Sequence, residues 1–237
     1  MQNLRDQRSY SWEVINGDPG PVAYQQTTRR GTLKGVQQNA SPHIKGKLAS
    51  NGDMFFELDW PDGLRMEAFV PADGATVVRT PEGWMSGQDV LAAMAEERTR
   101  LAEPSERYVW LRRADRPVLL RPDQELSPFI KGAGISETSG DSYIARARVR
   151  PDGWVIAAED NSQPSYNVTY TLNVRRGTLR DYEVRIEGAQ NFPRSGVQLP
   201  VNDVRLVVIT YVPVTRLDVP EEAREKAKAK KPAVTRD

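Results

Sequence analysis

The chain has 237 residues, of which 38% are hydrophobic, and its 33 basic and 32 acidic residues leave a formal net charge of +1. This length can bury a core without covalent staples, and the balanced charge argues against a nucleic-acid partner. The absence of cysteine excludes disulfides and thiolate chemistry, and the single histidine, His43, excludes a histidine-rich zinc site. No stretch approaches the roughly 20 apolar residues of a membrane-spanning helix, so we expect no transmembrane segment.

The N-terminal part of the chain alternates apolar and polar residues with the period of half-buried strands. It begins abruptly with the end of a helix, and we expect that a secretory leader has been removed ahead of it. In residues 54–60, one strand face carries Met54, Phe56, Leu58 and Trp60. The inner face continues in residues 64–70 with Met66. The strands predicted here are 10–15, 22–28, 44–50, 54–60, 64–70 and 75–79.

Helix is concentrated in one insertion at about residues 86–131. Ser86 is a suitable N-cap, and Asp89 favours the free N–H groups of the first turn. An apolar stripe at helical spacing then predicts a helix that ends before Pro104. A second helix is predicted at residues 105–113, and a short helical turn after Pro122. The residues at this spacing are Val90, Leu91, Met94, Arg98 and Leu101, and all of them except Arg98 are apolar.

A second run of strands is predicted at residues 143–149, 166–174, 179–187 and 204–212. Residues 204–212 are apolar on both faces, which predicts a covered central strand. The order of strands, helices and strands indicates an α+β fold, with one antiparallel sheet of about ten strands and a helical lid inserted mid-chain. We expect a single domain at residues 1–218, followed by a charged, disordered tail at 219–237.

The pentapeptide RRGTL occurs twice, at residues 29–33 and 175–179. Each copy follows an alternating strand, so Arg-Arg-Gly matches a three-residue hairpin loop closed by a glycine in the left-handed conformation. The alternative is an anion clamp built from paired arginines. Because arginines at a hairpin tip point into water, we favour the turn.

Three Pro-acid-Gly turns are flanked by tryptophan, at residues 60–63, 81–84 and 151–154. A tryptophan at a strand end either belongs to an ordinary core or forms the lip of an apolar cavity. No pair of carboxylates and no short motif marks a catalytic centre. We therefore predict no enzyme activity, no cofactor and no metal site.

The predicted lid must cover the apolar face of the sheet. If a curved sheet leaves space beneath the lid, an apolar groove results; a fully packed core is the alternative. The residues that would line the groove are Met54, Phe56, Leu58, Trp60, Met66, Trp84 and Met94.

The order of these features resembles the LolA/LolB-like superfamily of bacterial periplasmic proteins. The resemblance rests on Tyr10-Ser11-Trp12, on the stretch from Asp73-Gly74 to Gly83-Trp84, and on the turn Arg176-Gly177-Thr178-Leu179. It implies a strongly curved, half-open antiparallel barrel with helices as a lid over an apolar cavity. It also implies a periplasmic or otherwise extracytoplasmic location and an apolar partner, either a lipid or the acyl chain of a lipidated protein.

We therefore expect a non-catalytic protein that binds an apolar ligand and is able to contact a membrane surface peripherally. The alternative is a structural or protein-interaction module of the cell envelope, with a filled core and no small ligand. A hydrolase with unrecognised carboxylates is the third hypothesis.

Overall fold

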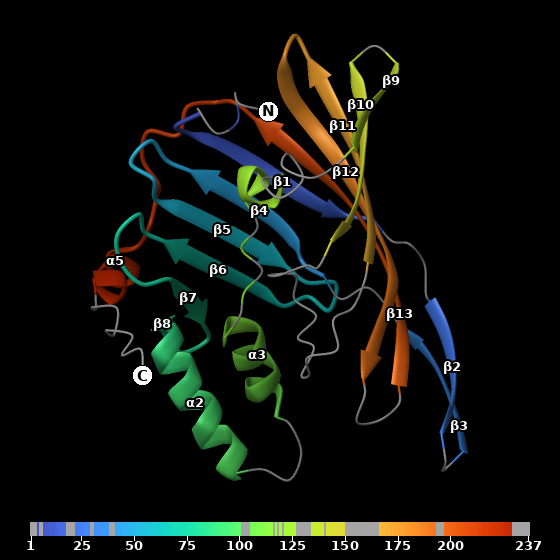
Figure 1. Cartoon of the computed structure of the whole chain (residues 1–237). Coiled ribbons are helices and arrows are strands. Elements are labelled where there is room, and N and C mark those ends of the chain that lie inside the picture. The colour runs from blue at the N-terminus through green and yellow to red at the C-terminus, as the bar shows by residue number, and fades with distance from the viewer. Residues whose placement is uncertain are drawn as a thin grey trace, which may run out of the picture. The chain divides into compact units, whose positions relative to one another are not determined.

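The computed structural model describes residues 4, 7–17, 22–28, 31–37, 41–100, 105–115, 117, 119, 121–126, 134–139, 141–149, 166–192 and 197–228. The chain forms two compact units (Figure 1). Unit 1 comprises Met1–Asp6, Trp12–His43 and Leu120–Thr210, and unit 2 comprises Gln7–Ser11, Ile44–Leu119 and Tyr211–Asp237. The sequence predicts one domain at residues 1–218, whereas this division splits the predicted insertion 86–131 between the two units.

The described part of unit 2 is an antiparallel sheet with the helices α2, α3 and α5. Its strands follow the order β8-β7-β6-β5-β4, so consecutive strands are neighbours. The helices α2 and α3 lie side by side (Figure 1), and α5 packs on β6, β7 and β8. The elements are β4 (His43–Leu48), β5 (Met54–Asp59), β6 (Arg65–Val70), β7 (Val77–Thr80), β8 (Gly83–Ser86), α2 (Gly87–Arg100), α3 (Glu106–Asp115) and α5 (Glu221–Lys228).

The turn between β5 and β6 follows directly from the sequence Pro61-Asp62-Gly63. Gly63 has a φ of 86°, a conformation that favours glycine, and its N–H donates to the Trp60 carbonyl at 2.9 Å. The Trp60 N–H donates to the Leu64 carbonyl at 2.9 Å and closes the hairpin. This turn fixes the register that places Leu58 opposite Met66.

Helix α2 begins with the predicted cap. The Ser86 N–H donates to Asp89 Oδ2 at 3.0 Å, and the Asp89 N–H donates to Ser86 Oγ at 3.3 Å, which is a reciprocal capping arrangement. The predicted apolar stripe is partly wrong, because Leu91 is 54% exposed while Val90 is fully buried. Ala93 completes the buried face instead. The second helix is confirmed as α3.

The C-terminal tail was predicted to be disordered, but its described residues, up to 228, are ordered. Residues 221–228 form α5, and Ala223 and Ala227 are buried. Leu217 and Val219 are buried in the same apolar cluster, just before the helix. The segment packs through small side chains, whose contribution to a core is hard to recognise in a charged sequence. Residues 229–237 lie outside the described residues.

Unit 1 is built on long strands. Its main order is β1-β13-β12-β11-β10-β9, and β2 and β3 form a separate two-stranded sheet. Residues 122–126 are helical, as predicted after Pro122. The strands are β1 (Tyr10–Asn16), β2 (Val22–Thr28), β3 (Gly31–Gln37), β9 (Gly134–Ser139), β10 (Ser142–Val149), β11 (Tyr166–Arg175), β12 (Thr178–Phe192) and β13 (Val197–Thr210).

Strands β11 and β12 present one apolar and one polar face. Tyr170 pairs with Val184 and Leu172 with Tyr182, and all of these side chains are buried. Strand β13 lies between β1 and β12, which confirms its predicted central position. The prediction that both its faces are covered is wrong, because Leu206 is 37% exposed.

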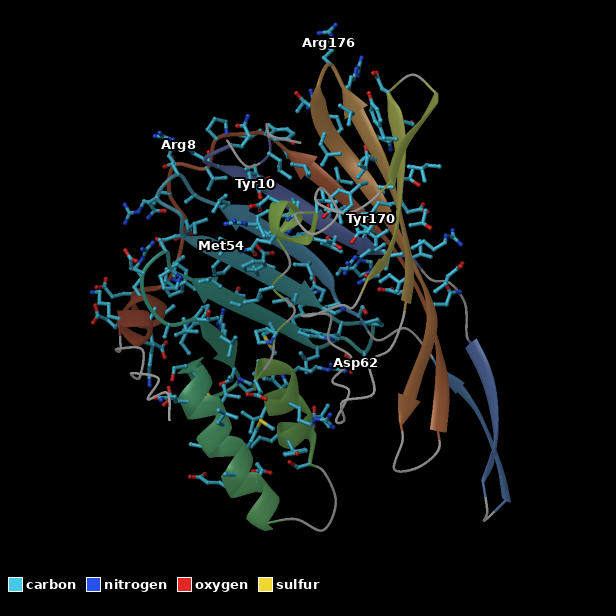
Figure 2. The ribbon with its side chains drawn as sticks, viewed as in Figure 1. Arg8, Tyr10, Met54, Asp62, Tyr170 and Arg176 are labelled. Carbon is cyan, nitrogen blue, oxygen red and sulfur yellow. The ribbon has the colours of Figure 1, made fainter. Side chains whose placement is uncertain are left out.

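The two RRGTL copies place their glycine at different positions of their hairpins. Arg175 pairs with Thr178, so the β11–β12 loop is the two-residue turn Arg176-Gly177, and both residues have positive φ, at 52° and 74°. These angles define a type I′ turn, which replaces the predicted three-residue loop. Figure 2 shows Arg176 at the tip of this hairpin, pointing away from the strands. In the first copy, Thr28 pairs with Gly31, so that glycine belongs to strand β3, and Arg29 and Arg30 lie outside the described residues.

The described strand pairings are antiparallel, which confirms the predicted strand class. The sequence missed β8 and β9, and β3 was recognised only as strand-like. The order of strands ends at β8 in unit 2 and at β9 in unit 1, consistent with an unclosed sheet. Among the described helices, none is long and apolar enough to cross a membrane. The role of the helices as a lid stays a prediction.

Candidate functional site

The predicted apolar lining is divided between the two faces of the unit 2 sheet. Phe56, Leu58 and Met66 share one face and are 1%, 0% and 2% exposed. Met54 lies on the same face, because it is two residues from Phe56 in β5. These side chains are therefore grouped as predicted, and three of them are fully packed.

Trp84 lies on the opposite face. It pairs with Arg79 across the β7–β8 hairpin, which puts it on the face that carries Val77. That face holds a buried cluster with Phe55 and Phe69, covered by α5. The predicted grouping of Trp84 with Met54, Phe56, Leu58 and Met66 is thus wrong. The reason is the register of β8, a short strand that the sequence pattern did not reveal.

Trp60 is 8% exposed and is covered by a cation. The guanidinium of Arg113 lies 5.2 Å from the centre of its ring. The same guanidinium donates to both carboxylate oxygens of Asp62, at 3.0 and 2.8 Å, and these hydrogen bonds hold the pKa of Asp62 below its usual value. Figure 2 shows Asp62 at the end of the β5–β6 hairpin. Trp60 therefore belongs to a contact that fixes α3, and no sequence pattern indicated Arg113 as its partner.

Arg107 fixes the helices α2 and α3 to the β7–β8 turn. It forms ion pairs with Glu82 and, at 2.6 Å, with Glu97. Ser105 Oγ donates to the second oxygen of Glu97 at 2.8 Å. The hydrogen bond from Arg107 lowers the pKa of Glu82, and the two carboxylates raise the pKa of Arg107. Met94, predicted to line the groove, is 8% exposed in the same helix as Glu97.

A half-open pocket of about 240 Å³ lies between β7, the start of α2 and the end of α3. Its wall is mainly apolar, with one carboxylate from Asp115 and one hydroxyl from Thr76. It shares no residue with the predicted lining. The residues that line it are Thr76, Val78, Gly87, Ala114, Asp115, Pro117 and Leu119.

Unit 1 contains a buried polar centre that the sequence did not reveal. The side chains of Glu125 and Arg205 are 2% and 6% exposed and form an ion pair. The Tyr182 hydroxyl donates to Glu125 Oε2 at 2.7 Å, and the ring of Tyr170 stacks on that of Tyr182 with 6.2 Å between centroids. Burial, reinforced by the Glu125 charge, raises the pKa of both tyrosines. The centre anchors the helical turn 122–126 to β12 and β13.

Among the described residues, no group of three or more histidine, aspartate or glutamate side chains is placed to hold a metal ion. No protein-family model, curated protein or solved structure matches this chain. The resemblance to the LolA/LolB-like superfamily accordingly stays a prediction.

Proposed function

We propose that the protein is a non-catalytic protein-interaction module and that its contact surface is the α2–α3 helix pair. The observation that carries this proposal is the outward placement of two large apolar side chains on these helices. Leu91 is 54% exposed and Val109 is 42% exposed. Their helical neighbours Val90 and Leu111 are buried, so each helix already has an apolar face toward the protein.

The helix pair is tied to neighbouring elements by ion pairs, which suits a preformed contact surface. Arg107 ties α3 to both Glu82 and Glu97, and Arg113 ties the end of α3 to Asp62. Preorganised side chains lose less conformational entropy on binding than mobile ones. Single exposed apolar residues are common on protein surfaces, so the proposal depends on their combination with these ion pairs.

Site-specific photo-cross-linking in the host cell tests this proposal. A photoreactive amino acid at position 91 or 109 is expected to give discrete protein adducts. Matched control positions are Glu96, an exposed residue of α2, and Arg185, an exposed residue of β12. Equal adduct patterns at all four positions, or none at positions 91 and 109, would reject the α2–α3 surface.

The second candidate function is binding of an apolar ligand, as the LolA/LolB-like resemblance implies. It is favoured by the common face of Met54, Phe56, Leu58 and Met66, but it requires these packed side chains to separate. Delipidation of the purified protein followed by mass spectrometry tests it, and a released stoichiometric lipid would support it. We also propose an extracytoplasmic location on the basis of the resemblance alone, to be tested by cell fractionation.

A further inference from the structure

The groove that holds α5 is built from much larger side chains than the helix that fills it. We use the name α5 groove for the surface formed by Phe55, Phe69, Val77 and Trp84, which are buried in one cluster with α5. The helix itself contributes only Ala223 and Ala227 to that cluster. Release of α5 would therefore expose large aromatic surface on the sheet and little apolar surface on the helix, so the groove requires an occupant.

The groove also recognises a carboxylate at one position of its occupant. Strand β8 ends the strand order of the unit 2 sheet, and its Trp84 N–H donates to Glu222 Oε1 at 3.2 Å. The next N–H that faces the same way, that of Ser86, donates to Asp89, and Lys226 of α5 lies 3.6 Å from that carboxylate. A strand edge with unpaired N–H groups readily pairs with another chain. Glu222 of α5 therefore occupies one N–H of this edge, and Lys226 of α5 contacts the Asp89 carboxylate that occupies the next.

The backbone of the groove fits α5 closely at Gly74. The Ala75 N–H donates to the Ala227 carbonyl at 3.0 Å. A Cβ atom at position 74 would lie 2.6 Å from the same carbonyl oxygen, and the φ of Gly74 is 141°. Any other residue at position 74 would therefore push the end of α5 away.

The occupant keeps its own shape through internal contacts. We call residues 217–228 the strap. Arg224 donates to the carbonyls of Leu217 at 3.1 Å and Val219 at 3.3 Å, and Lys228 pairs with Glu225 at 2.6 Å. These bonds move with the strap if it leaves the groove. A helix of this length is marginal on its own, and terminal segments with small buried surfaces open more easily than a core.

The linker ahead of the strap is long enough to reach another molecule. Residues 211–216, between β13 and the strap, contain neither helix nor strand, and six extended residues span up to about 20–22 Å. We infer that the strap exchanges between two copies of this chain, so that α5 of each copy fills the α5 groove of the other. The occupant is a second copy because each copy carries the fitting helix and the fitting groove, and reciprocal exchange closes a symmetric dimer. This inference concerns a surface separate from the exposed face of α2–α3 and does not depend on the proposed function.

A complementation experiment between two full-length variants tests the exchange. Ala223→Glu places a large charge at a buried position of the strap and leaves a normal groove. Gly74→Ala blocks the groove and leaves a normal strap. When the two variants are mixed, the strap of the Gly74→Ala chain is expected to fill the groove of the Ala223→Glu chain. Light scattering on a sizing column should then show that the mass doubles from 26.6 kDa.

The matched control replaces Gly74→Ala by Gly63→Ala. Gly63 also has a positive φ, of 86°, but a Cβ atom there meets nothing within 4 Å. The Gly63→Ala chain keeps a normal strap and a normal groove, so its straps fill grooves of Gly63→Ala chains and far less heterodimer with Ala223→Glu is expected. A mixture of Gly74→Ala and Ala223→Glu that forms no heterodimer would overturn the inference, as would an equal yield of heterodimer with the control.

Hydrogen exchange on the unaltered protein keeps the inference testable if either variant fails to fold. The amides of α5 are expected to exchange faster than those of β5 and β6, because the strap opens without unfolding of the sheet. Addition of a peptide with the sequence of residues 215–228 should increase α5 exchange further by competing for the groove. Equal protection of α5 and the sheet, unaffected by peptide, would show that the strap does not leave the groove and would refute the exchange.

Discussion

The buried pair of Glu125 and Arg205 allows a quantitative test by a double-mutant cycle. In the folded protein the Glu125 carboxylate accepts hydrogen bonds from Arg205 and from the Tyr182 hydroxyl, and both charged side chains are almost fully buried. Glu125→Leu leaves the Arg205 charge buried without its counterion. Loss of one partner of a buried pair costs about 3–5 kcal/mol, and the hydroxyl of Tyr182 loses a bond worth about 1–3 kcal/mol.

The double variant Glu125→Leu, Arg205→Met removes both charges together. Replacement of a whole buried pair by apolar residues is often neutral or stabilising, so the double variant should be more stable than either single variant. The assay is urea denaturation followed by tyrosine and tryptophan fluorescence, with the free energy of unfolding compared for the four proteins. If the two single effects simply add in the double variant, or if Glu125→Leu costs less than about 1 kcal/mol, Glu125 and Arg205 do not depend on each other in the folded protein.

Three further predictions use the same denaturation assay. The pKa values of Tyr170 and Tyr182 are raised by burial, so above pH 10 the folded state retains protons that the unfolded state loses. The free energy of unfolding should therefore be at its full value below pH 10 and should fall above it. The decrease is at most about 1.4 kcal/mol per pH unit for each tyrosine. Tyr182→Phe should reduce that slope, and an unchanged slope would count against the assignment. Arg176 has a φ of 52° in a type I′ turn, where asparagine is favoured, so Arg176→Asn should raise the free energy of unfolding by up to about 1 kcal/mol. A decrease would show that the Arg176 side chain makes a stabilising contact. Arg113→Ala should cost about 1–2 kcal/mol, because it removes both the contact with Trp60 and the bonds to Asp62, whereas the exposed Arg185→Ala should cost at most about 0.5 kcal/mol.

The strands with clear alternation were predictable from the sequence. In residues 166–174, tyrosine, valine and leucine alternate with asparagine and threonine, and this stretch forms β11 almost as predicted. The capping residues Ser86 and Asp89 likewise placed the start of α2. Strand β9 was missed because its sequence is mostly small and polar, and β3 was left uncertain because two glycines interrupt its pattern.

Contacts between distant parts of the chain were not predictable in the same way. The C-terminal helix reads as a charged tail, and its alanines become part of a core only against Phe55 and Phe69, far away in the sequence. The face of Trp84 depends on the register of a four-residue strand. A shift of one residue in a strand reverses the face of every side chain. The two RRGTL copies show the same effect, since identical sequences place their glycines at different positions of a hairpin.

The ion pairs that fix the helices could not be predicted from the sequence either. Arg107 and Arg113 are ordinary basic residues of a helix, and only the hairpin turns give them partners in Glu82 and Asp62. The buried Glu125 is similar, because a lone glutamate near a short helical turn carries no signal of burial. The sequence therefore predicted the strand class and the helical insertion, but not the register and polar contacts that define the sites.

We propose that the protein's own packing fills the apolar face of β5 and β6, so that the protein works through its surface. Native mass spectrometry after incubation with excess fatty acid and phospholipid distinguishes this arrangement from an open lipid cavity. We expect the mass of the polypeptide alone, because Phe56, Leu58 and Met66 leave almost no exposed surface for a ligand. A stoichiometric lipid adduct that is lost when Leu58 is replaced by arginine, with the fold retained, would show that this face opens to a ligand.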